Sequence, residues 1–323
     1  MKVGLICCGR LENRYAVEFV EHYKQLGFDN IHIMDNNHDN EEHFEDVLQQ
    51  YIDKEFVIIH NYRNIERVQD HILEIYYKIS NEYDWIFFCD FDEFLILKED
   101  KTIQDYLSRD CFKYANQILI NWSIYTDNDL IYDDGRSCLE RFDKKCLNHY
   151  MNTLTKPFIK TKLKDIKYFT VHCFNNNILF NTTYNNKGDK IYYNELSFFF
   201  DINYDLSYIK HFTTKTIDEY INNKLKRGTG DRSYNIFLDH YDLDEFFRVN
   251  EMTTEKLDYL KKHNIDISNL LSMKTIKDLS DEDLYSIKYH GYIINKMKYI
   301  AELQFFYNQI DEEIKRRDLK RNQ

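Results

Sequence analysis

The first hundred residues alternate short apolar runs with amphipathic segments. The runs at residues 3–8, 30–35 and 55–61 predict buried strands, because each is short and ends in polar positions. Two intervening segments repeat apolar residues at helical spacing. The first runs from residue 12 to 26 and stops before Gly27, and the second places four apolar residues on one face, namely Val68, Ile72, Ile75 and Ile79. Strands alternating with helices predict a parallel, right-handed α/β sheet.

A fourth apolar run, WIFFCDFDEFLIL at residues 85–97, leads directly into Asp90, Asp92 and Glu93. The run is too short to span a bilayer and is typical of a buried strand that presents acids at its end, where open α/β sheets bind ligands. Asp90 and Asp92 reach one metal ion only if the chain turns at Phe91. Their oxygens favour Mg²⁺ or Mn²⁺, which predicts a metal site for a phosphate-bearing substrate. Solvated loop acids or a helix cap are the alternative.

Length and charge narrow the class of protein. The 323 residues suffice for a catalytic domain with a smaller appended element. A net charge of −12 argues against nonspecific binding to nucleic acid. Seven cysteines without paired spacing indicate reduced thiols in the core. The sequence contains neither a transmembrane stretch nor a secretory signal, so we expect a cytoplasmic protein, with peripheral attachment to the inner face of a membrane left open.

Phosphate-binding glycine loops are missing from the sequence. No GxGxxG follows the first strand and no GxxxxGK[ST] occurs anywhere, so a metal has to hold the phosphates. A nucleotide-type sheet with paired acids after its fourth strand favours a nucleotide-sugar transferase. Three alternatives stay open: a haloacid-dehalogenase-type phosphatase, a nucleotidyltransferase and a non-catalytic carbohydrate-binding relative. The phosphatase fits less well, because its acidic pair normally ends the first strand.

Four blocks of the chain resemble glycosyltransferases of the GT-A fold, specifically the family 2-like group related to glycosyltransferase family 92. The blocks are CCGRLENRYAVEFVEHYKQLGF with IHIMDNNHDN, then RVQDHI, then DWIFFCDFDEFLIL, and later IKHFTTKTIDEYINNKLKRGTGD. They follow the order of the family. LENRY replaces the more usual Lys-Asn-Glu, which leaves the roles of Glu12 and Asn13 open. The resemblance implies a mainly parallel α/β sheet flanked by helices, in a GT-A domain over residues 1–238.

The resemblance also assigns donor-binding residues. Arg10 and Asp35 would contact the nucleoside or the diphosphate, although an Asx turn explains Asp35 equally well. Gln69 would lie near the sugar. Lys224 and Arg227 would neutralise the diphosphate, although a helix C-terminus before a glycine stop also accounts for them.

The metal ligands implied by the resemblance are Asp90, Asp92 and His211. Asp90 would also be shared with the ribose, and Glu93 would play a supporting role. His211 precedes a capping box that starts at Thr216. His172, in the predicted strand FTVHCF, is the competing histidine and could instead border the acceptor pocket.

The catalytic base is chosen from an acid-rich segment at residues 121–142. An inverting transferase needs a carboxylate that deprotonates the acceptor hydroxyl. Glu140, in LERF, and Asp134, beside Gly135, are the candidates, and Trp122 is either a sugar platform or a core residue. We therefore expect a metal-dependent enzyme that moves a hexose, galactose-like and from a UDP-sugar, onto a saccharide or lipid-linked saccharide acceptor in polysaccharide or glycoconjugate assembly. Inversion follows from the resemblance alone.

Residues 239–323 change character and predict a helical C-terminal region. Residues 280–317 place apolar side chains on a broad helical face, which would suit a homo-oligomer interface, closure of the acceptor site or docking to a membrane-associated partner.

Overall fold

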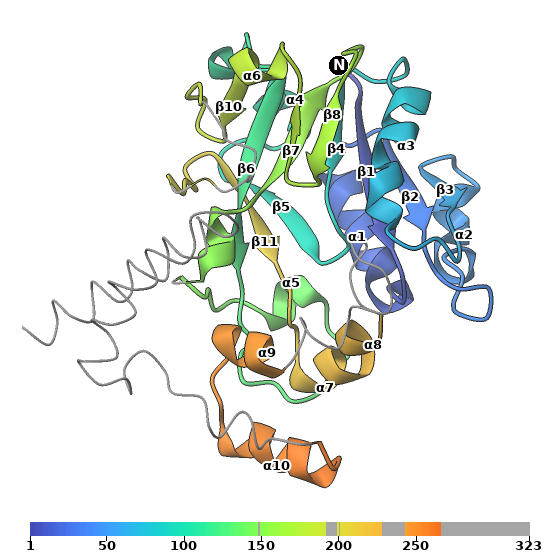
Figure 1. Ribbon diagram of the computed structural model, residues 1–323, viewed down its shortest axis with the longest axis vertical. Coiled ribbons are helices and arrows are strands. Elements are labelled where there is room, and N and C mark those ends of the chain that lie inside the picture. The colour runs from blue at the N-terminus through green and yellow to red at the C-terminus, as the bar shows by residue number, and fades with distance from the viewer. Residues whose placement is uncertain (148, 192–198, 200, 228–242, 266–323) are drawn as a thin grey trace, which may run out of the picture. The chain divides into compact units, whose positions relative to one another are not determined.

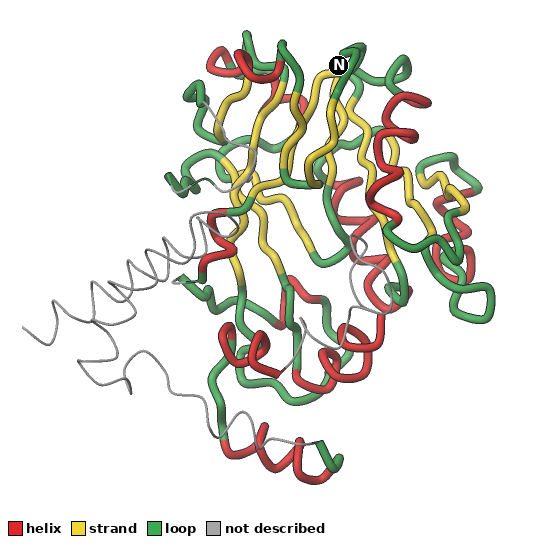
Figure 2. Tube along the Cα trace, viewed as in Figure 1, coloured by secondary structure: helices red, strands yellow, loops and turns green. Residues whose placement is uncertain are grey.

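The computed structural model describes residues 1–147, 149–191, 199, 201–227 and 243–265. The chain divides into two compact units, Met1–Lys256 and Leu257–Gln323. Figure 1 shows the first unit as a sheet flanked by helices, and Figure 2 separates the same elements by type.

Nine strands of the described residues form the main sheet. Along the sheet they are β3 (Val57–Asn61), β2 (Asn30–Asp35), β1 (Val3–Gly9), β4 (Trp85–Phe88), β7 (Thr155–Lys160), β6 (Gln117–Ile124), β11 (Ser207–His211) and β5 (Glu93–Leu97), with β10 (Thr183–Asn185) paired to β6. The predicted strands β1 to β4 are mutually parallel, which confirms the α/β sheet. Two antiparallel strands were not anticipated: β7 lies between β4 and β6, and β5 pairs with β11.

The helices fill the connections between strands. Their bounds are α1 (Asn13–Gln25), α2 (Glu45–Ile52), η1 (Val68–His71), α3 (Ile72–Ile79), α4 (Ile103–Leu107), η2 (Asp110–Phe112), α5 (Cys138–Arg141), η3 (Tyr150–Thr153), α6 (Leu179–Thr182), α7 (Ile217–Glu219), η4 (Tyr220–Lys224), α8 (Leu225–Arg227), α9 (Leu243–Val249) and α10 (Thr254–Lys262). η1, η2 and η3 are 3₁₀ turns, whereas η4 is a π-helical turn. Helix α1 ends as predicted, and Gly27 after it has a φ of +87°.

Two hydrophobic clusters cover the two faces of the sheet. In β1, Leu5 belongs to the cluster that includes Phe19 of α1, whereas Ile6 belongs to the cluster that includes Ile72 and Tyr76 of α3. Successive strand residues point to opposite faces, so the sheet is buried on both sides. This explains why its central strands are continuous apolar runs in the sequence. The seven cysteines are free thiols, and four of them are buried in the core, whereas Cys111 is exposed, contrary to the prediction.

The acid-bearing run at residues 85–97 is two strands rather than one. β4 ends at Phe88 and β5 begins at Glu93, so Asp90, Phe91 and Asp92 form the connection between them. β5 then runs antiparallel to β11, with Glu93 paired to His211 in the register. This pairing brings the acidic turn beside the end of β11.

The predicted strand FTVHCF is wrong. β8 (Lys167–Thr170) and β9 (Cys173–Asn175) form a separate antiparallel hairpin, and Val171 and His172 form its turn. The apolar pattern gave no sign of this reversal, because the turn carries a valine rather than glycine or proline.

Two helices, α9 and α10, lie in the described part of the predicted C-terminal region, and the predicted boundary at residue 238 stays a prediction. α9 packs within the first unit, where Phe246 lies 5.2 Å from the ring of Tyr220. The long apolar helix expected at residues 280–317 lies outside the described residues. Within the described residues, no helix combines the length and apolarity that a bilayer crossing requires.

Candidate active site

The side chain of Phe91 anchors the acidic turn between β4 and β5 in the hydrophobic core. The Phe91 side chain is buried in the core, where it stacks on Phe44 at 5.2 Å and lies 4.6 Å from Phe19. A Cβ atom built on Gly9 would come within 2.5 Å of the Phe91 ring, so only glycine allows this approach. The two aspartate neighbours of Phe91 both line the pocket that is described below. The turn at Phe91 that a shared acidic site requires is therefore present.

A buried lysine holds the first aspartate. Lys156 of β7 is 1% exposed, and its Nζ lies 2.5 Å from Asp90 Oδ2 and 3.3 Å from Glu93 Oε1. Burial opposes the charge, but Asp90 and Glu93 outweigh it and raise the pKa of Lys156 above its usual range. Burial also raises the pKa of Glu93 well above its usual range, despite Lys156. The other carboxylate oxygen of Asp90, Oδ1, accepts a hydrogen bond from the Gln69 amide at 3.4 Å.

Three cationic or basic side chains surround the second aspartate. Asp92 Oδ2 lies 3.0 Å from Lys224 Nζ and 3.5 Å from Arg227 Nη2, and Asp92 Oδ1 lies 3.5 Å from His211 Nε2. Burial alone would raise the pKa of Asp92, but Lys224 and His211 hold that pKa well below its usual range. Asp92 is therefore an anion whose charge is balanced from within the protein.

Glu12, whose role the sequence left open, belongs to the same site. It is 3% exposed, and its Oε1 contacts Arg227 Nη1 in an ion pair. The Arg227 carbonyl accepts a hydrogen bond from Arg10 at 3.3 Å, and Arg10 also forms a two-point ion pair with Glu41. Arg227 belongs to residues 215–227, which carry several lysines and are called the basic segment below. The start of α1 and the basic segment are thus joined through Arg227.

The basic segment is positioned by a second buried ion pair. Thr216 and Glu219 form the predicted capping box at the start of α7. Glu219 also accepts two hydrogen bonds from the fully buried Arg141 guanidinium, both at 2.9 Å, and one from the Tyr15 hydroxyl at 2.6 Å. These contacts fix α7, and the π-helical turn that follows carries Lys224. π-Helical turns are frequent at functional sites.

The two aspartates and several of their partners border one pocket of about 170 Å³ at the carboxyl ends of β1 and β4. Lining residues include Arg10, Glu12, Gln69, Asp90, Asp92, Trp122, Met151, His172, His211, Lys224 and Arg227. The Trp122 ring lies 4.1 Å from His211 and 4.8 Å from His172. Two buried nitrogens, Trp122 Nε1 and His211 Nδ1, have no hydrogen-bond partner among the described residues. The pocket is smaller than the roughly 300 Å³ or more of typical small-molecule sites.

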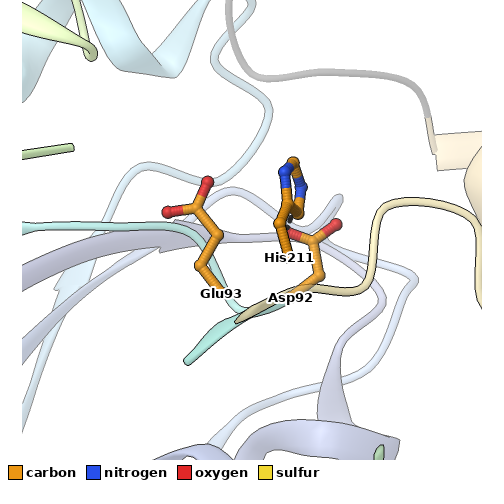
Figure 3. A group of neighbouring side chains, drawn as sticks. All are labelled: Asp92, Glu93 and His211. Atoms are coloured by element: carbon orange, nitrogen blue, oxygen red, sulfur yellow. Dashed lines mark ion pairs between the residues drawn. The ribbon is translucent and has the colours of Figure 1, made fainter. Parts of the chain in front are cut away.

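The donor set fits a divalent cation. Asp92, Glu93 and His211 each offer one ligand atom, and these atoms all lie within 4.8 Å of one another (Figure 3). Two carboxylate oxygens and an imidazole suit Mn²⁺ or Mg²⁺. This group differs from the predicted set in having Glu93 in place of Asp90, whose Oδ2 pairs with Lys156.

The pocket brings together most of the predicted site residues, which are spread from residue 10 to residue 227. Those that line it are Arg10, Gln69, Asp90, Asp92, His211, Lys224 and Arg227. Three predicted residues, all in the described part of the chain, do not line it. Asp35 forms an Asx turn with Asn37 and an ion pair with Arg63 at 2.6 Å. Asp134 pairs with Arg136, and Glu140 caps α5 through Ser137.

The family of this chain follows from its sequence. The sequence profile of glycosyltransferase family 92 matches residues 12–227. The chain belongs to glycosyltransferase family 92. The resemblance inferred from the sequence is thereby confirmed. No curated protein shows significant sequence similarity to this family 92 chain.

Solved structures show only remote similarity to this family 92 chain. One is S. aureus TarS, residues 1–349, in complex with UDP, at 11% identity over 98% of this chain and 92% of that chain, with a TM-score of 0.40. Another S. aureus TarS structure aligns at 12% identity over 42% of this chain and 23% of that one, with a TM-score of 0.29. The mannosyltransferase PcManGT from Pyrobaculum calidifontis, in complex with GDP-Man and Mn²⁺, aligns at 8% identity over 37% of this chain and 35% of that one, with a TM-score of 0.27.

Two buried residues that support the pocket through ion pairs, Lys156 and Arg141, had no recognised signal in the sequence. Lys156 lies in a short strand that was not predicted, and its partner Asp90 is 66 residues away. Arg141 follows the Glu140 that we had selected, and it is Arg141 that is buried and paired. A polar residue inside an apolar run is the only hint the sequence offered for Lys156.

Proposed function

We propose that this chain is a metal-dependent nucleotide-sugar glycosyltransferase. Its donor would be a UDP-sugar carrying a hexose such as galactose, its metal Mn²⁺ or Mg²⁺, and its acceptor a saccharide or lipid-linked saccharide. Transfer would proceed with inversion, in polysaccharide or glycoconjugate assembly. The protein would act in the cytoplasm, with peripheral attachment to the inner face of the membrane as an alternative setting.

One observation carries the proposal: two acidic or imidazole groups, Asp92 and His211, and two cationic side chains, Lys224 and Arg227, line the same pocket. Asp92 and His211 lie within 3.5 Å of one another, and Lys224 lies 3.0 Å from Asp92. A diphosphate needs both kinds of partner, because its charge is neutralised partly by a metal and partly by basic side chains.

The residues would divide the work of transfer between them. Asp92 and His211, with Glu93 adjacent, would hold the metal, which when bound supplies positive charge to the leaving diphosphate. Lys224 and Arg227 would donate charged hydrogen bonds to the same diphosphate, stabilising the charge that develops on it as the bond between the anomeric carbon and the diphosphate oxygen breaks and the bond to the acceptor oxygen forms. Gln69 and Asp90 face the pocket together, and their polar atoms suit the hydroxyl groups of a ribose or sugar.

The test is a panel of nucleotide sugars offered to the purified chain with Mn²⁺, scored by hydrolysis of the donor and by the shift in melting temperature. We expect slow, metal-dependent hydrolysis of at least one UDP-sugar. Asp92→Asn should abolish metal binding measured by calorimetry and reduce hydrolysis by about a hundredfold or more.

A different result would separate the alternatives. A response to sugar 1-phosphates with nucleoside triphosphates would indicate a nucleotidyltransferase. Saccharide binding without any hydrolysis, unchanged in Asp92→Asn, would indicate a carbohydrate-binding relative. No response to any UDP-sugar, with metal binding intact in Asp92→Asn, would contradict the proposal.

A further inference from the structure

We propose that Lys224 and Arg227 are built-in counter-ions of the acidic site, so that the site accepts a divalent cation and a nucleoside diphosphate together and binds either one weakly alone. The inference rests on the proposed function and specifies which form of the donor the site recognises.

The starting point is the charge balance around Asp92. Its carboxylate is 4% exposed and has lysine and arginine nitrogens on Oδ2, with a histidine nitrogen facing Oδ1. Lys215 adds a weaker electrostatic contribution from the start of the same segment. A buried carboxylate with this many basic neighbours is already neutralised before any ligand arrives.

The second step concerns Glu12. It is also 3% exposed, and its ion pair is with Arg227, which reaches Asp92 with its other terminal nitrogen. One guanidinium therefore contacts two buried acids, Glu12 and Asp92, that are distant from each other in the sequence. Moving Arg227 away would leave both acids without that charge.

A cation arriving alone meets an unfavourable site. It would compete with Lys224 for Asp92, and the displaced ammonium would remain close to a new positive charge. Like charges at such distances in a partly buried site repel strongly, so the affinity for the free metal is lowered.

A diphosphate arriving alone meets the converse problem. Its contacts would draw Lys224 away from Asp92, and Arg227 away from both Asp92 and Glu12. The buried carboxylates would then face a further anion. Removing one partner of a buried ion pair is costly because the other charge is left uncompensated.

When the two ligands arrive together, each compensates for the disruption caused by the other. The metal takes the place of the ammonium and guanidinium on Asp92, and the diphosphate takes the place of the carboxylates on Lys224 and Arg227. Every charge then keeps a partner of opposite sign. Thermodynamic linkage requires the effect to be reciprocal: each ligand must raise the affinity for the other by the same factor.

The experiment is titration calorimetry on the full chain. UDP is titrated in EDTA and again in saturating MnCl₂, and MnCl₂ is titrated without nucleotide. We expect Mn²⁺ to tighten UDP binding by about tenfold or more. Lys224→Met should bind Mn²⁺ alone more tightly than the unmodified chain, and Mn²⁺ should have a smaller effect on its UDP affinity. Arg227→Met should change both quantities in the same direction.

The matched control is Lys226→Met. Lys226 lies in the same segment but is exposed, and its Nζ contacts Asn222 at 3.3 Å rather than an acid of the pocket. This variant should keep both the affinity for Mn²⁺ alone and the effect of Mn²⁺ on UDP. It separates the contribution of local ion pairs from a general loss of positive charge.

The outcomes distinguish this inference from the function on which it rests. If UDP binds equally well with and without Mn²⁺, or if Lys224→Met weakens binding of Mn²⁺ alone, the counter-ion role is overturned while nucleotide binding stands. If UDP binds under neither condition, the proposed function itself fails. The titrations of the unmodified chain need no variant, so a poorly folding substitution does not prevent the decision.

Discussion

Lys156 Nζ and Asp90 Oδ2 lie 2.5 Å apart, although the two residues are 66 positions apart in the sequence. The lysine comes from β7, the antiparallel strand inserted between β4 and β6, and the aspartate from the turn that follows β4. The strand order of the sheet therefore delivers a buried cation to the acidic turn. Glu93 shares this cation at 3.3 Å.

Replacing this cation should destabilise the fold. Lys156→Met leaves Asp90 and Glu93 facing each other without a neutralising charge, and we expect the free energy of unfolding to fall by about 3–5 kcal/mol. Urea denaturation measures the change. Lys160→Met, in the same strand, is the control, because Lys160 lies over the Trp85 ring at 5.2 Å and should cost far less. Equal losses in the two variants would contradict the role of the buried cluster.

The predicted catalytic acids Asp134 and Glu140 can be tested directly. Both are exposed, and their carboxylates are engaged by Arg136 and Ser137. Loss of a general base usually reduces turnover by about 10²–10⁴-fold. We expect the turnover of Asp134→Asn and Glu140→Gln, assayed with donor and acceptor, to fall by much less than this. A hundredfold reduction in either variant would restore it as the base.

The ion pair of Glu219 with Arg141 should make stability depend on pH. Burial would raise the pKa of Glu219, but the Arg141 guanidinium outweighs burial and holds that pKa below its usual range. The unfolded chain therefore binds the proton more readily, so the stabilisation is complete above about pH 5 and is lost as the pH falls through the folded pKa.

Glu219→Gln reports this contribution. We expect a loss of about 3–5 kcal/mol in unfolding free energy at pH 7, and a difference from the unmodified chain that shrinks as the pH is lowered below about 4. Glu140→Gln removes an exposed capping carboxylate and serves as the control with a much smaller effect. A difference that grows on acidification would mean that the pKa shift has the opposite sign.

Trp122 should distinguish the sugar from the nucleotide. Its indole nitrogen is buried in the pocket wall without a hydrogen-bond partner among the described residues, and a buried N–H is costly unless something accepts it. We expect a hydroxyl group of the transferred sugar to accept this hydrogen bond. Trp122→Phe keeps an aromatic ring and should reduce the affinity advantage of a UDP-sugar over UDP by about tenfold, measured by competitive titration. Equal weakening of both ligands would indicate that Trp122 only supports the fold.

The features that were predicted correctly are those that depend on the residues of one short segment. The strands β1 to β4, helix α1 with its glycine stop and the capping box at Thr216 each follow from a local pattern, and the structure confirms them. The acidic turn was also recognisable, because charged residues interrupt an apolar run. The cluster of basic residues around Lys224 was also visible in the sequence, and the resemblance to a family selected Lys224 and Arg227 within it.

The rest depends on contacts between distant segments. Nothing near Lys156 indicates that β7 is inserted between β4 and β6, because an apolar strand looks the same whichever neighbours it has. The turn at His172 lacks the residues that mark reversals. Arg141 and Glu140 are adjacent and both charged, and only packing shows which one is buried.

The register between β5 and β11 places Glu93 opposite His211, and Asp92 precedes Glu93. The positions from which ligands project are therefore set by backbone hydrogen bonds, which do not depend on the side chains attached there. A change of one residue at His211 would alter the chemistry of the ligand set without rebuilding its frame. If the proposed metal site holds, a single substitution at one of these positions would change its preference for one divalent ion over another while the fold stays the same.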